Sequence, residues 1–376
     1  MPRTTLPLDV LVLGEHPSAY LAAAMLLDKP ELNVAHATIP NEHAPDRLAV
    51  INPGVFQLHK ALDKASKKLE MTPIHGVAFI GEDANTRGEW RAKSTAAWIC
   101  EYGHVRKAFC QVAKEAGAKL YNPKTLTVGP VDEKGFEIHA DNHVLRPSAV
   151  LLAGALPREQ AKVLALPEMF AVEVMRRFSF VRLKGDKWAD PAGKSILPMS
   201  LDLSGKLTWA WMMPGEGEVQ LAVEQPIDDA TPAAKLLQKW ADVLRRHGFL
   251  KQATSIEPGQ VKSMEIPAAG ALAREIVANR TLLFGPAGGF FTACLEDIYP
   301  NCWSATFAVS AVRAALKQPH LQDALQPYRQ EWGTTLGDYL RGPQQNLRFL
   351  LPLVYRNPSM TSRMAESILL GKSVVR

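Results

Sequence analysis

The alternation of apolar and polar positions predicts a strand–helix–strand unit at the start of the chain. Residues 9–13 form an apolar run typical of a buried strand, residues 17–27 an alanine-rich helix, and residues 32–39 a second strand. Together they span about 30 residues, the usual length of a βαβ unit. Further along, apolar residues recur at helical spacing within 102–120, which predicts an amphipathic helix that ends at Gly117.

The middle of the chain carries the shorter period of β-strands. Residues 75–99 predict two strands joined by a polar turn, and residues 126–141 predict a hairpin. From about 170 to 225 the pattern changes to short alternating strands, at 178–184, 206–214 and 218–226, and a helix follows over 233–249. This region predicts a sheet of short strands with one long helix.

The strand–glycine–helix pattern returns near residue 280. Residues 280–291 read as an apolar strand followed by glycines, and residues 301–316 read as the next helix. The residues after 321 are helical in pattern, and LRFLLPLVY suits either a helix packed on the core or one resting on a membrane surface. Because there is no internal repeat and no low-complexity linker, we expect an α/β protein whose domains are interleaved.

Composition excludes several classes of protein. The chain has 376 residues, 47% apolar and 22% charged, which is ordinary for about two or three globular domains. The net charge of +5 is too small and dispersed to indicate a nucleic-acid partner. The four cysteines lack metal-ligand spacing, so we expect reduced thiols and no metal site. Without a signal-peptide core or an apolar run of roughly 20 residues, we expect a cytoplasmic protein that is at most peripheral to a membrane.

Four segments, in this order, carry a resemblance to a known family. They are the opening βαβ unit, the helix beginning VRKAF, the strand LTWAWMMP and the loop LLFGPAGGFF. The residues that match an Arg-x-x-Phe-Asp helix are Arg106 and Phe109. Those that match a Tyr-x-Trp-x-Phe-Pro strand are Trp209, Trp211, Met213 and Pro214, and those that match a Gly-Asp-Ala-Ala-Gly loop are Gly285, Ala287 and Gly289. The chain resembles the FAD-dependent oxidoreductases of the geranylgeranyl reductase and aromatic hydroxylase superfamily.

The resemblance implies a fold and an activity. It implies a Rossmann-like three-layer FAD/NAD(P)-binding domain from residues 1–65, 100–165 and 265–320. An antiparallel substrate-binding sheet is inserted from 66–99 and 166–264, and 321–376 form a C-terminal helical region. The implied activity is that of an FAD-dependent reductase or monooxygenase. Its substrate is small and apolar, either isoprenoid or aromatic, and NAD(P)H or a reduced carrier is the reductant.

The resemblance also assigns residues to two sites. The residues expected at FAD are Gly14, His16, Ser18, Ala19, Arg47, Arg106, Gly285, Pro286, Ala287, Gly288 and Gly289. Those expected to line the substrate pocket are Trp209, Trp211, Met213, Pro214 and Phe291. By spacing alone, the two tryptophans share one face of a strand and suit a core equally. No catalytic acid or base is assigned, since Glu296 and Asp297 fit either a proton carrier or a helix-capping pair.

The cofactor motifs depart from the family at several points. Where G-x-G-x-x-G is expected, the chain reads GEHPSA, so only Gly14 is kept. A side chain at His16 is expected to point into the phosphate path, where a histidine either obstructs the phosphate or donates to one of its oxygens. Carboxylates are absent at the end of the second strand near His36, within AGALPR, and at Pro286. Three interpretations stay open: FAD in a remodelled site, a binding or scaffold protein that has lost FAD, or another ligand in the same cleft.

Overall fold

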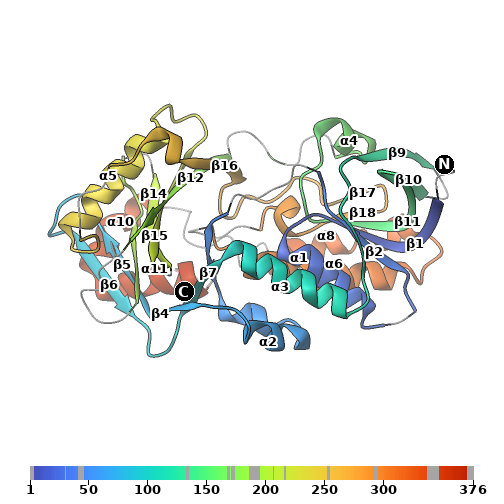
Figure 1. Cartoon of the computed structure of the whole chain (residues 1–376), viewed down its shortest axis with the longest axis horizontal. Coiled ribbons are helices and arrows are strands. Elements are labelled where there is room, and N and C mark those ends of the chain that lie inside the picture. Colours follow the sequence, from blue (N-terminus) through green and yellow to red (C-terminus); the bar gives the residue numbers. More distant parts are fainter. Residues whose placement is uncertain are drawn as a thin grey trace.

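A computed structural model gives the fold of the chain (Figure 1). It describes residues 4–29, 31–40, 46–132, 135–166, 170, 174–185, 195–205, 207–215, 217–251, 255–290, 295–336 and 347–370. Two parts lie side by side, each built on its own large sheet (Figure 1). The α/β class with a C-terminal helical region is therefore confirmed.

The first sheet is mainly parallel and contains both strands of the predicted βαβ unit. Its order is β17 (Val277–Ala278), β18 (Thr281–Leu283), β11 (His143–Leu152), β1 (Thr4–Leu13), β2 (Val34–Ala37) and β8 (Lys119–Tyr121). Only β17 runs antiparallel to its neighbour along this path. The hairpin of β9 (Leu126–Asp132) and β10 (Gly135–Ala140) joins the sheet through β11. Parallel strands of this kind bring their carboxyl ends to one edge, where ligands of doubly wound folds bind.

Helices cover this sheet and isolate α1 (Pro17–Leu27) from solvent. Helix α1 packs between α3 (Tyr102–Glu115) and α6 (Ile298–Ala315), so nearly all of its side chains are buried. Its alanines permit this close packing on several sides. The remaining helices of this part are α2 (Lys60–Ser66), α4 (Arg158–Val163), α7 (Leu321–Ala324) and α8 (Tyr328–Glu331), with a π-helical turn at Trp332–Leu336.

The second sheet is mixed and has seven strands. Its order is β16 (Lys262–Pro267), β12 (Met175–Lys184), β15 (Glu218–Pro226), β14 (Trp209–Gly215), β13 (Ile196–Ser200), β5 (Gly76–Ile80) and β6 (Arg87–Arg91). Only β13 and β5 pair in parallel. A small third sheet of β3 (Leu48–Ile51), β7 (Ala97–Glu101) and β4 (Thr72–Ile74) lies between the two parts. The stretch 75–99 thus contributes to three strands, where the sequence predicts two.

The two faces of the second sheet have different covers. Helix α5 (Ala233–Arg246) packs on the face that carries Ala210 and Met212. Helices α10 (Leu347–Arg356) and α11 (Pro358–Leu370) pack on the opposite face, which carries Trp209, Trp211 and Met213. Within the described residues, no helix combines the length and apolar character needed to cross a bilayer. Buried residues of the C-terminal helices, Val354 and Met364 among them, are part of the core of this sheet.

Candidate functional site

The loop after β1 makes the tight turn expected of the first glycine. Gly14 has φ of 131°, and a Cβ there would lie 2.9 Å from the backbone nitrogen of Gly154. A side chain is excluded both by this contact and by the backbone conformation. Next to it, Glu15 forms an ion pair with Arg106 of α3. This part of the expected nucleotide loop is kept.

His16 is the N-cap residue of α1. Its Nδ1 accepts the N–H of Ser18 at 3.1 Å, and the N–H of Ala19 donates to the His16 carbonyl at 2.9 Å. Pro17, the first helical residue, has no N–H. A helix N-terminus attracts phosphate through its free N–H groups. The first three helical positions here offer none.

A buried ion pair lies beside His16. Arg47 Nη2 donates to Asp297 Oδ2 at 2.7 Å, and His16 Nε2 lies 3.6 Å from the same oxygen. The Arg47 guanidinium stacks on the Tyr102 ring, 4.3 Å from its centroid. Arg47, Asp297 and His16 are 1%, 4% and 5% exposed. We call these three residues the Arg47–Asp297–His16 cluster.

The charge states within the cluster follow from burial and contact. Burial alone would raise the pKa of Asp297, but the Arg47 charge, the nearby His16 ring and the hydrogen bond from Arg47 outweigh it and lower that pKa. Burial lowers the pKa of His16 by more than Asp297 raises it. The cluster therefore holds an ionised carboxylate, an arginine and a neutral histidine at neutral pH.

The glycine-rich loop packs against other parts of the same chain. A Cβ at Gly285 would lie 2.6 Å from Ser18 Oγ, one at Gly288 2.3 Å from the Phe290 ring, and one at Gly289 2.3 Å from the Ala271 carbonyl oxygen. The N–H of Gly285 donates to Ser304 Oγ at 2.8 Å, and that of Ala287 to the Ala153 carbonyl at 3.1 Å. These glycines allow other parts of the chain, namely Ser18, Phe290 and Ala271, to pack closely against the loop backbone.

A cavity lies at the carboxyl end of β2, between α1, α3 and β8. Its volume is about 540 Å³, and its lining includes His36, Thr38, Arg106, Lys107, Lys114 and Asn122. His36 Nε2 donates to the Gly14 carbonyl at 2.8 Å, and its ring stacks on Tyr20 at 4.4 Å. We call this space the β2-end cavity.

Comparisons with solved structures place this fold. A geranylgeranyl bacteriochlorophyll reductase-like protein from Thermoplasma acidophilum matches with a TM-score of 0.70 and 16% identity, over 94% of this chain and 93% of that one. A flavoprotein/dehydrogenase from Cytophaga hutchinsonii matches with a TM-score of 0.70 and 15% identity, over 97% and 93%. A probable FAD-dependent monooxygenase from Pseudomonas aeruginosa matches with a TM-score of 0.65 and 15% identity, over 93% and 97%. The chain has the fold of the FAD-dependent oxidoreductases.

The resemblance stated from the sequence is thereby confirmed at the level of the fold. No protein-family model matches the chain, and no curated protein matches it by sequence. The chain therefore shares the FAD-oxidoreductase fold with proteins to which it is only 15–16% identical.

The residues at the pyrophosphate position of the FAD-oxidoreductase fold do not fit that group. In dinucleotide-binding folds the phosphates rest on the helix N-terminus and close to glycine backbone. Here the Ser18 N–H is taken by His16, and Gly285 contacts Ser18 directly. Arg47, a cation that could pair with a phosphate, is already bonded to Asp297. We derive no chemistry through FAD at this position.

The predicted substrate-pocket residues that the structure describes are in the core. Trp209, Met213 and Pro214 are buried, and Trp211 has no exposed surface. Trp211 stacks on Phe178 with ring centroids 5.6 Å apart, on the face covered by α11. This packing favours the core alternative for the tryptophans. Phe291 lies outside the described residues.

The acid pair before α6 divides between the two roles considered from the sequence. Glu296 Oε1 accepts the N–H of Tyr299 at 2.9 Å, as a helix cap does. Asp297 makes no such cap bond and turns to Arg47 instead. Sequence reasoning named Arg47 and Asp297 separately but had no signal that joins them, because they lie 250 positions apart.

We expect the free energy of unfolding to fall by about 2 kcal/mol between pH 7 and pH 5 because of His36 alone. Burial lowers the pKa of His36 to about 4, against the raising effect of its hydrogen bond to Gly14. The unfolded chain, with a pKa near 6.5, takes up a proton in this interval that the folded protein does not. Stability is therefore lost as the pH falls, which urea denaturation at the two pH values measures.

A matched pair of variants isolates this contribution. His36→Gln keeps an N–H for the Gly14 carbonyl but does not titrate, so its stability should depend less on pH than that of the wild type. The same substitution at exposed His320 should leave the pH dependence unchanged. A His36→Gln variant with the full wild-type pH dependence would contradict the assignment.

Proposed function

We propose that this chain is a small-molecule binding protein built on the FAD-oxidoreductase fold, which uses the β2-end cavity and holds no resident FAD. The observation that carries the proposal is the Arg47–Asp297–His16 cluster. Its side chains lie where a pyrophosphate would bind at the start of α1. The Ser18 N–H, which a pyrophosphate would need as a donor, is bonded to His16.

Packing around the second sheet supports the same proposal. The face that the family resemblance assigns to substrate is covered by α10 and α11. Met364 and Ile368 of α11 belong to the same hydrophobic core as Trp211. A catalytic flavin needs a substrate space next to its ring. The β2-end cavity is separate from this face and borders the first sheet.

A second candidate is an FAD-dependent oxidoreductase that acts on an apolar substrate with an external reductant. One observation favours it: several buried polar atoms in and beside the Arg47–Asp297–His16 cluster have no hydrogen-bond partner among the described residues. They are Arg47 Nε, Asp297 Oδ1 and both amide atoms of Asn301. Such atoms are costly unless a ligand or water satisfies them.

The visible absorption spectrum separates the two candidates. The purified protein is mixed with excess FAD and desalted, and the spectrum is recorded together with the thermal midpoint. We expect no retained flavin band and no shift of the midpoint. The FAD-dependent monooxygenase from Pseudomonas aeruginosa, treated identically, is the positive control. Flavin retained in a one-to-one ratio would overturn the proposal and establish the second candidate.

A further inference from the structure

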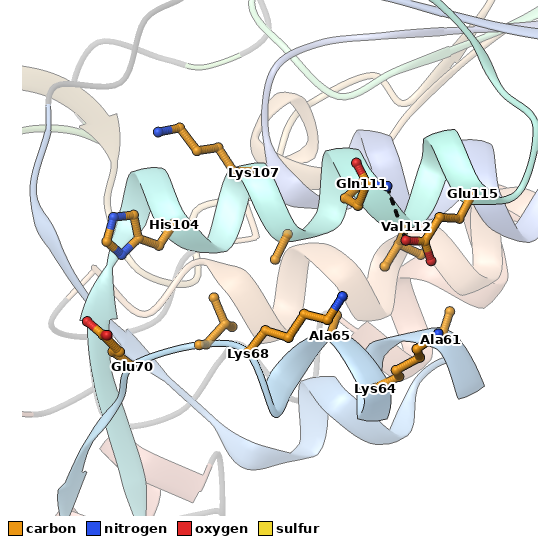
Figure 2. A pocket seen from close by; sticks show the side chains of 12 residues that line it. Ala61, Lys64, Ala65, Lys68, Glu70, His104, Lys107, Gln111, Val112 and Glu115 are labelled. Carbon is orange, nitrogen blue, oxygen red and sulfur yellow. Dashed lines mark hydrogen bonds between the residues drawn. The ribbon is translucent and has the colours of Figure 1, made fainter.

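A groove with an apolar floor runs between α2 and α3 (Figure 2). Its volume is about 400 Å³, and the apolar side chains of its lining are buried or partly buried: Ala61, Ala65, Leu69, Ala108 and Val112. Lys107 and Gln111 of α3 line both this groove and the β2-end cavity, so they form the ridge between the two. We call this second space the α2–α3 groove.

The rim of the α2–α3 groove carries lysines without an acidic partner. Lys64 lies on α2 and Lys68 just after it, and both are exposed and line the groove. Neither forms an ion pair within the part of the chain that the structure describes, whereas Lys67 between them is paired with Asp63. Figure 2 shows Lys64 and Lys68 below α3, on the α2 side of the groove. Their charges are therefore available to a partner.

The fold gathers on these two segments an excess of positive charge that is dispersed in the sequence. Residues 60–70 and 102–115 together contain seven lysines and arginines against three acidic residues, a net charge of +4, while the whole chain has +5. One of the seven, Arg106, is paired with Glu15. The excess becomes local only because α2 packs beside α3. A surface of this sign attracts acidic partners.

The dimensions of the α2–α3 groove suit an α-helix. Its lining on α3 runs from His104 to Glu115, which spans about 17 Å, or three helical turns. A helix with apolar residues at i, i+3, i+4 and i+7 covers an apolar floor of this length, and its flanks then meet the rim. The two acidic residues of the lining, Glu70 and Glu115, stand at opposite ends of the groove in Figure 2. The lysines therefore face the flanks of such a helix.

The chemistry of the lining disfavours two other anionic partners. A single-stranded nucleic acid stacks its bases on aromatic side chains, and the described lining contains no Phe, Tyr or Trp. A bilayer surface takes up protruding apolar side chains, and α2 and α3 have no large apolar side chain that is fully exposed. The apolar floor would stay uncovered in both cases.

We propose that the α2–α3 groove docks an amphipathic α-helix of an acidic partner protein. Apolar residues of that helix pack on Ala65, Leu69 and Ala108, and its carboxylates pair with Lys64 and Lys68. The inference goes beyond the proposed function and does not depend on it, because it concerns a different surface. Three turns of helix bury less area than a standard interface, so the complex is transient, with a Kd on the order of micromolar.

Fluorescence anisotropy with the full chain tests the class of partner. The probe is a labelled synthetic helix with leucines at i, i+3, i+4 and i+7 and glutamates on its flanks. One control peptide has the same composition in a scrambled order, and another has lysine in place of glutamate. We expect the acidic amphipathic peptide to bind at least tenfold more tightly than either control, and to bind more weakly as salt is added.

Three outcomes of this titration overturn the proposal. Equal binding of the scrambled peptide would show that only charge is read and that the groove contributes nothing. Absence of binding at peptide concentrations up to about 1 mM would show that no such helix docks. Displacement of the peptide by phosphatidylglycerol vesicles or by a single-stranded oligonucleotide would assign the surface to a membrane or to a nucleic acid.

A charge-matched pair of variants tests the location at physiological salt. Lys64→Glu with Lys68→Glu should weaken binding of the acidic peptide at least tenfold and strengthen binding of the lysine peptide. Lys29→Glu with Lys317→Glu makes the same change at two exposed lysines beside a different hollow, between α1 and α6, and should alter neither. Equal weakening by both pairs, or unchanged binding in the first pair, would overturn the assignment to the α2–α3 groove. Circular dichroism checks that both variants are folded.

Discussion

Replacing Asp297 by alanine should lower the free energy of unfolding by about 3–5 kcal/mol. The change removes the only carboxylate in the Arg47–Asp297–His16 cluster and leaves the Arg47 guanidinium buried without its anionic partner, beside the Tyr102 ring. Arg47 cannot shed its proton, so the full penalty of a buried cation remains. Urea denaturation at pH 7, followed by circular dichroism, measures the loss.

Two further variants show whether the loss comes from burial of the charge. Glu137→Gln breaks the Glu137–Arg146 pair at the surface and should lower the free energy of unfolding far less than Asp297→Ala does. Arg47→Met combined with Asp297→Leu removes both charges and should recover most of the stability lost in Asp297→Ala. A loss below about 1 kcal/mol in Asp297→Ala would show that the cluster is open to water and that its residues are free to serve a ligand.

Trp211→Ala should lower the free energy of unfolding by about 3–5 kcal/mol. The indole has no exposed surface, stacks on Phe178 and contacts the cluster to which α11 contributes Met364 and Ile368. Removing it leaves a cavity between β14 and α11 that neither element can fill without moving. Thermal and urea denaturation of the purified variant give the size of the effect.

The conservative variant Trp211→Phe distinguishes packing from ligand contact. Phenylalanine keeps an aromatic ring against Phe178 and removes the indole N–H, which has no partner among the described residues. We therefore expect a loss below about 1.5 kcal/mol. If Trp211→Ala instead folds with wild-type stability, the tryptophan lines an open space and the substrate-pocket assignment from the sequence regains support.

The elements that the sequence predicts well are those with a strong period and a local stop signal. The strand at 9–13, the helix at 17–27 and the amphipathic helix from 102 are found as β1, α1 and α3. Strand β13 is missed because its five residues, ILPMS, contain a proline and show no alternation. Periodicity reports which side of an element is apolar, and it does not report what covers that side. The cover of Trp211 by α11 therefore has no signal in either segment alone.

The site is predictable to a similar depth. The sequence singles out His16 as an obstacle to phosphate, and the structure gives its place as the cap of α1. The glycines at 285–289 predict a close approach, which exists, but composition cannot say whether a cofactor or Ser18 approaches. Asp297 acquires its role only through Arg47, a partner distant in the chain. The sequence points to His36 only because it stands where the family has a carboxylate. The structure adds that one ring nitrogen bonds to the Gly14 carbonyl and that the other has no partner among the described residues.

Helix α11 covers the second sheet but follows all of its strands in the sequence. Asn52 donates to the carbonyl of Leu369, a contact across 317 positions, and the core beneath β14 includes residues of α11. During synthesis, one apolar face of the second sheet stays uncovered until α11 has left the ribosome. Contacts of such sequence separation form slowly, and uncovered strands of this kind associate with one another. We expect a nascent chain halted before α11 to leave this face exposed and to depend on chaperones.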